Sequence, residues 1–259
     1  MKIRIADLDI NWDLHIKDFV SLFSLGNEAE ADPVMTISDN VNTGECHGVQ
    51  FAQTPSDHIL RRSDTLCEML CADKEWCQVS IYCDDYCDPH FTLPLAAVCS
   101  RFAAFDALLL HGSFVEYNGN GIVFTGYSGI GKTTQAKLWE KYLNAEIING
   151  DKVFIRNFHN EIFAYGLPWK GSSPYCLNKK APLKAVVVLR QAKENSIRQL
   201  NLMECMEYFM PHIFMPHWDE KCLSWTLDTF DNILEKVPVW LLECRPDEDA
   251  VKLTRDMVL

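Results

Sequence analysis

Eight consecutive residues near the middle of the chain combine three glycines, a lysine and a threonine at a spacing suited to phosphate chemistry. Residues 126–133, GYSGIGKT, fit the P-loop pattern GxxxxGK[ST] at every fixed position. Such glycines let backbone N–H groups converge on an anion, and the helix that follows adds its own free N–H groups. Lys132 is then expected to neutralise the β and γ phosphates of a nucleoside triphosphate, most simply ATP, while the Thr133 hydroxyl binds Mg²⁺. The alternative is a glycine-rich turn that matches the pattern by chance.

The nucleotide contacts expected from this motif are Gly126, Tyr127, Ser128, Gly129, Ile130, Gly131, Lys132, Thr133 and Thr134.

Two further side chains are candidates for the chemistry beside the phosphates. Asp151 ends the short apolar segment AEIING and could supply a second hard oxygen ligand for the metal and accept the proton of an attacking hydroxyl. Its alternative role is that of a turn residue beside Gly150. His111 lies in the apolar run LLLHGS, where an imidazole could orient the base or contact phosphate. A buried, hydrogen-bonded histidine is the alternative there.

The elements that must position these residues follow from hydrophobic periodicity and turn residues. The apolar runs LLLHGSFVEY and GIVFTG, joined through Asn and Gly, predict a hairpin whose second strand enters the glycine-rich segment. KTTQAKLWEKYL predicts a helix, AEIING a short strand, and KVFIRNF with IFAYG a second hairpin. PLKAVVVLR (182–190) has the composition of a buried central strand. Helices are expected at 202–214 and 219–236, then the strand VPVWLLEC and a closing helix from Asp247.

The N-terminal part has weaker patterns. We expect strands at 2–10, 33–38 and 77–83, a helix at 56–72, and a largely buried helix at 93–107. The predicted organisation is an N-terminal α+β extension (1–94) packed on a P-loop nucleotide-binding domain (95–259), an α/β core of mixed β-sheet with flanking helices.

Composition limits the classes of function. Of the 259 residues, 48% are hydrophobic and 23% charged, which is typical of folded globular proteins. The formal net charge of -12 argues against a nucleic-acid binder, because phosphate backbones are held by clustered Lys and Arg. No run approaches the roughly 18 to 20 apolar residues of a membrane span, and the start MKIRIADLDI lacks the features of a signal peptide. We therefore expect a cytoplasmic protein with no nucleic-acid or membrane partner.

Eleven cysteines are present, and five of them lie close together: Cys67, Cys71, Cys77, Cys83 and Cys87. The gaps between them match no standard zinc pattern. Reduced thiols that pack as small hydrophobes are the expected state, with a structural zinc site as the alternative.

The combination of motifs resembles a known family. HGSxV, NGxGIxFTGxSGxGKTT, INGDK and YGLPWKG, within residues 108–200, are similar to the HPr kinase/phosphorylase-related P-loop proteins, whose fold is similar to the nucleotide domain of phosphoenolpyruvate carboxykinase. The resemblance implies that His111 sits in the active site, that Lys132 and Thr133 hold phosphate and metal, and that Asp151 is the second of two carboxylates. Gly150 occupies the position of the first.

The resemblance also suggests where an acceptor would bind, although no motif for recognising HPr is found and Thr134 departs from the family pattern. Lys152 is expected to contact phosphate or substrate, or else to be an exposed hairpin lysine. In YGLPWKG (165–171), Trp169 is a lid or a core anchor and Lys170 is a candidate contact for an anionic substrate. Arg190, at the end of a predicted strand, is a candidate phosphoryl contact or a surface residue, and Arg245 before Pro246 is a similar candidate.

Two functions from different classes follow. The first is a Mg-ATP-dependent kinase that phosphorylates a hydroxyl of a small molecule or peptide, with Asp151 as base and metal ligand. The second is an ATP-binding regulator or scaffold without transfer chemistry, which Gly150 at a carboxylate position favours. A phosphoenolpyruvate carboxykinase is disfavoured because the chain is short for that family and lacks a second metal-binding His and Lys set. The acceptor is not identified, and a homo-oligomer is left open.

Overall fold

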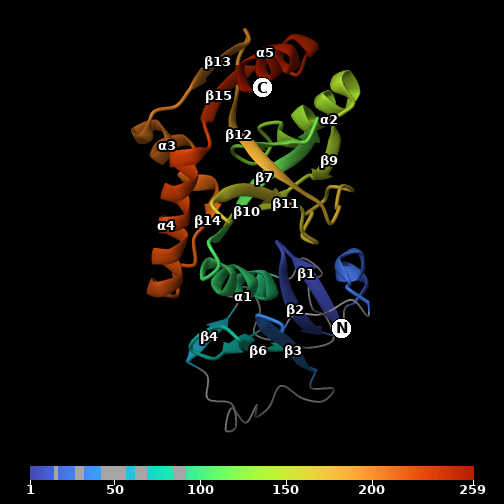
Figure 1. The fold of residues 1–259 in the computed structure, drawn as a ribbon, viewed down its shortest axis with the longest axis vertical. Helices are drawn as coiled ribbons and strands as arrows, with labels where there is room; N and C mark the ends of the chain where they lie inside the picture. Colours follow the sequence, from blue (N-terminus) through green and yellow to red (C-terminus); the bar gives the residue numbers. More distant parts are fainter. Residues whose placement is uncertain (15–16, 27–31, 42–56, 62–68, 84–91) are drawn as a thin grey trace. The chain divides into compact units, whose positions relative to one another are not determined.

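The computed structural model describes residues 1–14, 17–26, 32–41, 57–61, 69–83 and 92–259 (Figure 1). The chain forms two compact units, Met1–Phe102 and Ala103–Leu259. The division falls at the end of the helix Thr92–Ala103, whereas the boundary predicted from the sequence, between residues 94 and 95, lies near the start of that helix. Together the units have a mixed α/β fold with two mixed sheets and accompanying helices.

The first unit is built on a six-stranded sheet in the order β1-β2-β3-β6-β5-β4. Its strands are β1 (Lys2–Ile5), β2 (Leu8–Asp13), β3 (Met35–Val41), β4 (His58–Arg61), β5 (Met69–Ala72) and β6 (Gln78–Cys83). A 3-10 helix, η1 (Asp18–Phe23), and helix α1 (Thr92–Ala103) complete it. The predicted strand at 2–10 is a hairpin instead, because Ala6 and Asp7 both take positive φ and form a tight two-residue turn.

Two of the predictions for this unit are wrong in part. The helix expected at 56–72 is absent from the described residues of that span, where His58–Arg61 and Met69–Ala72 are paired strands. Pairing of β5 with β6 buries Leu70 completely, so sheet packing overrides the helical spacing of the apolar residues. Helix α1 ends at Ala103, short of the predicted 107, because Ala107 already begins the next strand.

The structure describes only some of the clustered cysteines at positions 67–87. Cys71 is buried and Cys77 is partly exposed, both as free thiols, while Cys67 and Cys87 lie outside the described residues. Within the part of the chain that the structure describes, no three His, Cys, Asp or Glu side chains are grouped so as to hold a metal ion.

The second unit contains a nine-stranded sheet in the order β11-β10-β7-β8-β12-β15-β13, with β9 and β14 also paired to β7. Its strands are β7 (Ala107–Tyr117), β8 (Asn120–Thr125), β9 (Glu146–Asn149), β10 (Lys152–Phe158), β11 (Glu161–Tyr165), β12 (Lys180–Gln191), β13 (Ser196–Gln199), β14 (Ile213–Phe214) and β15 (Val239–Cys244). Its helices are α2 (Lys132–Leu143), α3 (Leu202–Tyr208), η2 (Met210–His212), α4 (Glu220–Lys236) and α5 (Glu248–Val258). Both predicted hairpins, the central strand and the helix over KTTQAKLWEKYL are confirmed.

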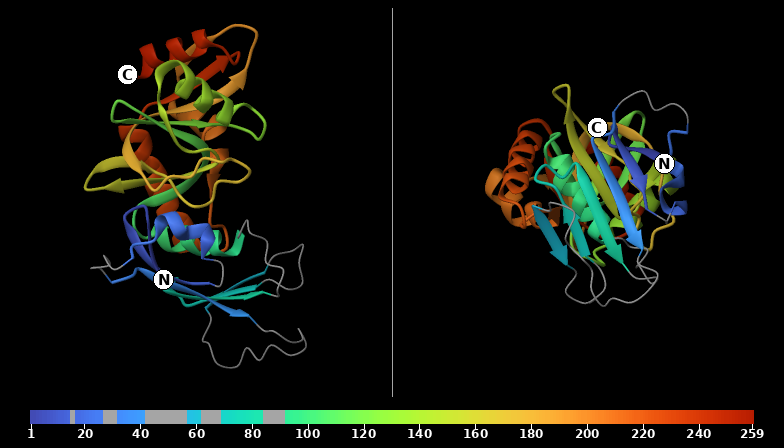
Figure 2. Two further views of the ribbon diagram at one scale, coloured as in Figure 1. Left: turned by 90° about the vertical axis from the view of Figure 1, so that its right-hand side faces the viewer. Right: turned by 90° about the horizontal axis from the view of Figure 1, so that it is seen from below.

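Helices cover both faces of the parallel strands β8, β12 and β15. Along β12, Val186 and Val188 belong to one apolar core, with side chains of α4, and Val187 and Leu189 to the other, with side chains of α2 and α5. Figures 1 and 2 show α5 beside α2, with α3 and α4 together elsewhere on the sheet. This double burial explains why the β12 sequence is almost continuously apolar.

The region after β12 departs most from expectation. Strand β13 was not predicted, and the helix expected at 202–214 ends at Tyr208. Pro211 follows in the 3-10 helix η2, and since proline cannot donate the next helical hydrogen bond, the chain turns and pairs as β14 with β7. Among the described residues, no helix has both the length and the apolar composition needed to cross a membrane.

Strand β7 changes partners halfway along its length. Residues up to His111 pair with β10, and residues from Gly112 pair with β8. A Cβ at Gly112 would lie 2.9 Å from both Phe124 O and Val123 Cγ1, so the close approach requires glycine. His111 therefore stands where the sheet changes its pairing, beside the start of the glycine-rich loop.

Candidate functional site

The loop between β8 and α2 has the backbone of an anion cradle. Gly126, Gly129 and Gly131 adopt φ values of 140°, 78° and 115°, which side chains rarely allow. Gly131 is the N-cap of α2 and offers no capping side chain, so the first N–H groups of the helix are left for another acceptor. Loop and helix end together favour a bound anion.

Lys132 folds back across this loop. Its Nζ donates to Gly126 O (3.0 Å) and Tyr127 O (3.1 Å), and the residue is only 7% exposed. Burial lowers the pKa of Lys132, and the charge of Asp151 offsets part of that shift. An anionic ligand would supply the negative charge that this buried ammonium lacks.

Three segments meet at the carbonyl oxygen of Gly150. Thr133 Oγ1, at the start of α2, and Ser113 Oγ, in β7, each donate to Gly150 O at 3.0 Å. Ser113 is fully buried, and although it belongs to the HGSxV motif, the sequence analysis assigned it no role of its own. The contacts place the Thr133 hydroxyl beside the turn that carries Asp151.

Asp151 lies between two cationic or polarisable groups. His111 Nε2 is 3.3 Å from Asp151 Oδ1, and Lys152 Nζ forms an ion pair with Oδ2. Burial raises the pKa of Asp151, but hydrogen bonds and charge from His111 and Lys152 outweigh it and lower the pKa to about 2. The β7–β10 register pairs Lys152 with His111 directly, so the sheet itself brings these residues to Asp151.

Asn149 holds the turn in place. Its Oδ1 accepts from the backbone N–H groups of Asp151 (2.9 Å) and Lys152 (3.2 Å), an Asx-type turn. Its Nδ2 donates to Leu167 O at 2.8 Å, and the residue is fully buried. Asn149 thus links Asp151 to the loop 166–173. The sequence analysis missed this role, although an Asn just before Gly-Asp is a recognisable turn signal.

His212 is a second histidine at the site that the sequence analysis missed. β14 pairs Ile213 with Leu110, so His212 comes next to His111 on the side of β7 opposite Lys152. His212 is 8% exposed, and burial, aided by the charges of Lys132 and His111, lowers its pKa to about 4. It is therefore a neutral imidazole at pH 7. The ring of Tyr127 meets it edge-on at 5.0 Å.

A cavity of about 290 Å³ lies where these groups converge. Its lining residues are His111, Ser128, Gly129, Gly131, Lys132, Thr133, Thr134, Gly150, Asp151 and Ser172. Gly171 borders Asp151 closely, since a Cβ at Gly171 would lie 2.7 Å from Asp151 Oδ2. The loop 166–173 therefore forms one side of the cavity, a position from which it could meet an acceptor.

The remaining residues predicted for the site lie in different surroundings. Tyr127 is 69% exposed, and Trp169 is 2% exposed, a burial that fits a core anchor rather than a lid. Lys170, within the loop 166–173, is exposed. Arg190 pairs with Glu243 at 3.6 Å and is not among the residues that line this cavity. Lys152 contacts Asp151 rather than solvent alone.

The space at Gly150 is already filled. A Cβ at this position would overlap Ser173 Oγ and lie 2.6 Å from Ser173 Cβ. A carboxylate at position 150 is therefore incompatible with Ser173 as it stands. The chain has one acidic residue at this turn, and the serine occupies the room that a second acidic side chain would need.

Comparison with known proteins adds little to this geometry. No family model matches the chain, and no curated protein matches its sequence. Among solved structures, the chain is similar to the HPr(Ser) kinase/phosphatase from Coxiella burnetii, with 10% sequence identity and a TM-score of 0.36. That alignment covers 57% of this chain and 95% of the other. A likeness of this size does not establish a shared fold or activity.

Proposed function

We propose that this protein is a Mg-ATP-dependent kinase that transfers the γ-phosphoryl group to a hydroxyl of a small molecule or peptide. The observation that carries the proposal is the convergence of Lys132, Thr133, Asp151 and His111 on one cavity at the start of α2. The motif resemblance to HPr kinase-related proteins agrees with it. Neither nucleic acid nor a membrane is a proposed partner.

The triphosphate would lie along the loop 126–131, with its oxygens accepting from loop and helix N–H groups. Lys132 Nζ would then donate to phosphate oxygens in place of the two backbone carbonyls. The negative charge of the phosphates would balance the positive charge of the partly desolvated ammonium. Neutral His212 adds no charge but offers a ring nitrogen at the same end of the loop.

Thr133 and Asp151 suit a magnesium ion. A hydroxyl and a carboxylate are the hard oxygen ligands that Mg²⁺ takes in phosphate sites, with phosphate oxygens and waters completing its coordination. Both line the cavity, and the low pKa of Asp151 keeps the carboxylate ionised at neutral pH. When bound, the ion would neutralise charge on the β and γ phosphates.

Asp151 would also receive the acceptor hydroxyl. The acceptor oxygen would attack the γ phosphorus while the bond between that phosphorus and the β–γ bridging oxygen breaks, and the hydroxyl proton passes to Asp151. A carboxylate with a pKa of about 2 is a weak base, so its main contribution is to orient the hydroxyl and accept the proton late. His111 keeps the carboxylate oriented through its 3.3 Å contact.

Asp151→Asn tests the assignment with two separate measurements. ATP binding by calorimetry should persist, while phosphate transfer from γ-labelled ATP to a panel of hydroxyl-bearing metabolites and peptides should be lost. Asp228→Asn, an exposed aspartate of α4, is the matched control and should keep both activities. Unchanged transfer by Asp151→Asn would overturn the proposed role.

A regulator that binds ATP without transferring phosphate is the second candidate, and Ser173 packed against Gly150 is the observation that favours it. It predicts ATP binding with no labelled product from any acceptor. The double variant Gly150→Asp/Ser173→Gly makes room for the missing carboxylate. If the wild type transfers no phosphate from γ-labelled ATP and the double variant does, the result would support the regulator assignment.

A further inference from the structure

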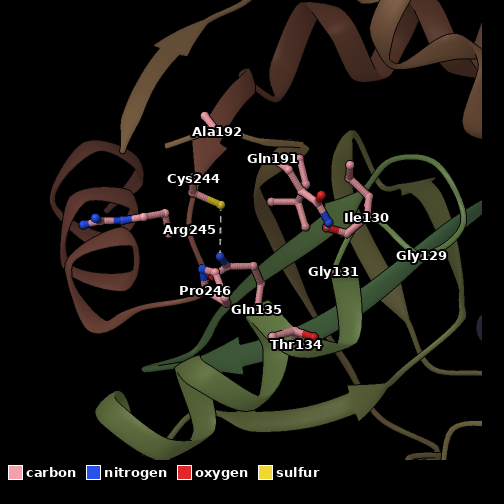
Figure 3. A pocket seen from close by; sticks show the side chains of 11 residues that line it. Gly129, Ile130, Gly131, Thr134, Gln135, Gln191, Ala192, Cys244, Arg245 and Pro246 are labelled. Atoms are coloured by element: carbon pink, nitrogen blue, oxygen red, sulfur yellow. Dashed lines mark hydrogen bonds between the residues drawn. The ribbon is translucent and has the colours of Figure 1, made fainter. Parts of the chain in front are cut away.

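A second cavity adjoins the first on the other side of the glycine-rich loop. It has a volume of about 410 Å³ and shares Gly129, Gly131 and Thr134 with the phosphate-side cavity. Its remaining walls include Ile130, Gln135, Leu189, Gln191, Cys244 and Pro246 (Figure 3). The volume falls within the range of about 300 to 1,000 Å³ common for small-molecule sites.

This second cavity lies at the carboxyl ends of parallel strands. β8, β12 and β15 run parallel, and they end respectively in the glycine-rich loop, in Gln191 and Ala192, and in Cys244 to Pro246. Ligands of open α/β sheets bind at these strand ends. A molecule whose phosphates lie in the first cavity could therefore extend its other end into the second.

The walls of the second cavity combine apolar side chains with polar ones. Leu189 and Cys244 are buried, and Ile130 and Pro246 complete an apolar surface suited to a flat ring. Gln191 Nε2 donates to Ile130 O at 3.4 Å, which ties the glycine-rich loop to the end of β12. Asp247 accepts from Arg245 Nε at 3.0 Å, so the guanidinium at the cavity edge is already paired.

Gln135 has an unusual environment for a buried amide. It follows Thr134 in the first turn of α2 and is only 3% exposed. Its Nε2 donates to Cys244 Sγ at 3.2 Å, a weak acceptor, and among the described residues its buried Oε1 has no hydrogen-bond partner. Buried amide oxygens are nearly always paired, so this one calls for an explanation.

We infer that the second cavity holds the nucleobase of the bound triphosphate and that Gln135 determines which base is accepted. This inference rests on the proposed nucleotide binding. Rotation of the amide breaks only its contact with Cys244 and turns Oε1 toward the cavity that Gln135 lines. The oxygen then accepts from the exocyclic amino group of adenine, whereas the carbonyl oxygen of guanine at the same position accepts from Nε2 of the unrotated amide, which leaves Oε1 buried and unpaired.

Inorganic tripolyphosphate separates this inference from the proposed function, because it carries the phosphates without a base. Calorimetric titration with Mg²⁺ and each of ATP, GTP and tripolyphosphate gives three affinities for the wild type. ATP should bind about tenfold or more tightly than either of the others. If none of the three binds, the proposed function fails and this inference falls with it.

Gln135→Leu keeps the size of the side chain and removes its amide. It should lower ATP affinity about tenfold, to the level of GTP, and leave tripolyphosphate affinity unchanged. Gln199→Leu, the same change at an exposed position of β13, is the matched control and should keep the preference for ATP.

Ala192→Phe fills the cavity from the end of β12 and keeps the phosphate loop intact. It should reduce ATP binding to the tripolyphosphate level, which tests the cavity even if Gln135→Leu folds poorly. Equal affinity of the wild type for ATP and tripolyphosphate, or an unchanged ATP-to-GTP ratio in Gln135→Leu, would overturn the inference and leave phosphate binding intact.

Discussion

Gly150→Ala places a methyl group where Ser173 already lies. The new Cβ would overlap Ser173 Oγ and approach Ser173 Cβ to 2.6 Å, and neither atom is the far end of a long, flexible side chain. Overpacking of this kind costs about 1 to 3 kcal/mol. For a protein of this size, that corresponds to a fall in melting temperature of roughly 2 to 12 °C.

A double-mutant cycle separates this overlap from a general loss of stability. Ser173→Gly removes both clashing atoms, so Gly150→Ala/Ser173→Gly should recover at least about 1 kcal/mol relative to the sum of the single changes. Ser173→Ala removes Oγ but keeps the Cβ contact, and should recover less. Differential scanning calorimetry of the wild type, the three single variants and the two double variants measures these differences in stability.

The reasoning is refuted if Gly150→Ala melts at the wild-type temperature, or if Ser173→Gly recovers no more than Ser173→Ala. The first result would mean that the turn at Gly150 shifts to accommodate the methyl group at no cost. The second would mean that Ser173 does not fill the space beside Gly150. Either outcome would also reopen position 150 as a place for a carboxylate.

Three further predictions concern the same site. Lys132→Met should weaken ATP binding at least about tenfold in calorimetry without lowering the melting temperature, because the ammonium it removes is partly desolvated. Asn149→Ala should lower the free energy of unfolding in urea by about 2 to 4 kcal/mol, because it removes three hydrogen bonds, one of them buried and two of them partly buried. The folded-state pKa of His212, about 4, lies below its ordinary value of 6.5, so the unfolded chain binds the proton first as pH falls. Stability should therefore decline from pH 6.5 to about 4, by no more than about 3 kcal/mol for this group, and His212→Gln should lack that part of the decline in urea titrations at pH 7.5 and 5.

Sequence alone was enough for the parts of the site that are contiguous in the chain. The order strand, glycine-rich loop and helix around residues 126–133 follows from local periodicity and from glycines that permit positive φ. The hairpin β7–β8 follows in the same way from two apolar runs joined by Asn and Gly. Local patterns misled where sheet pairing decided the conformation, as in β4 and β5.

Only the tertiary structure decided which distant residues meet. The β7–β10 register brings Lys152 and Asp151 to His111, and β14 adds His212, a residue that no motif marks. Gln135 and Cys244 are 109 positions apart, and their contact exists because α2 and the end of β15 border one cavity. Such proximities depend on strand order and register, which are set by long-range packing of whole apolar faces and leave no trace in the spacing of neighbouring residues.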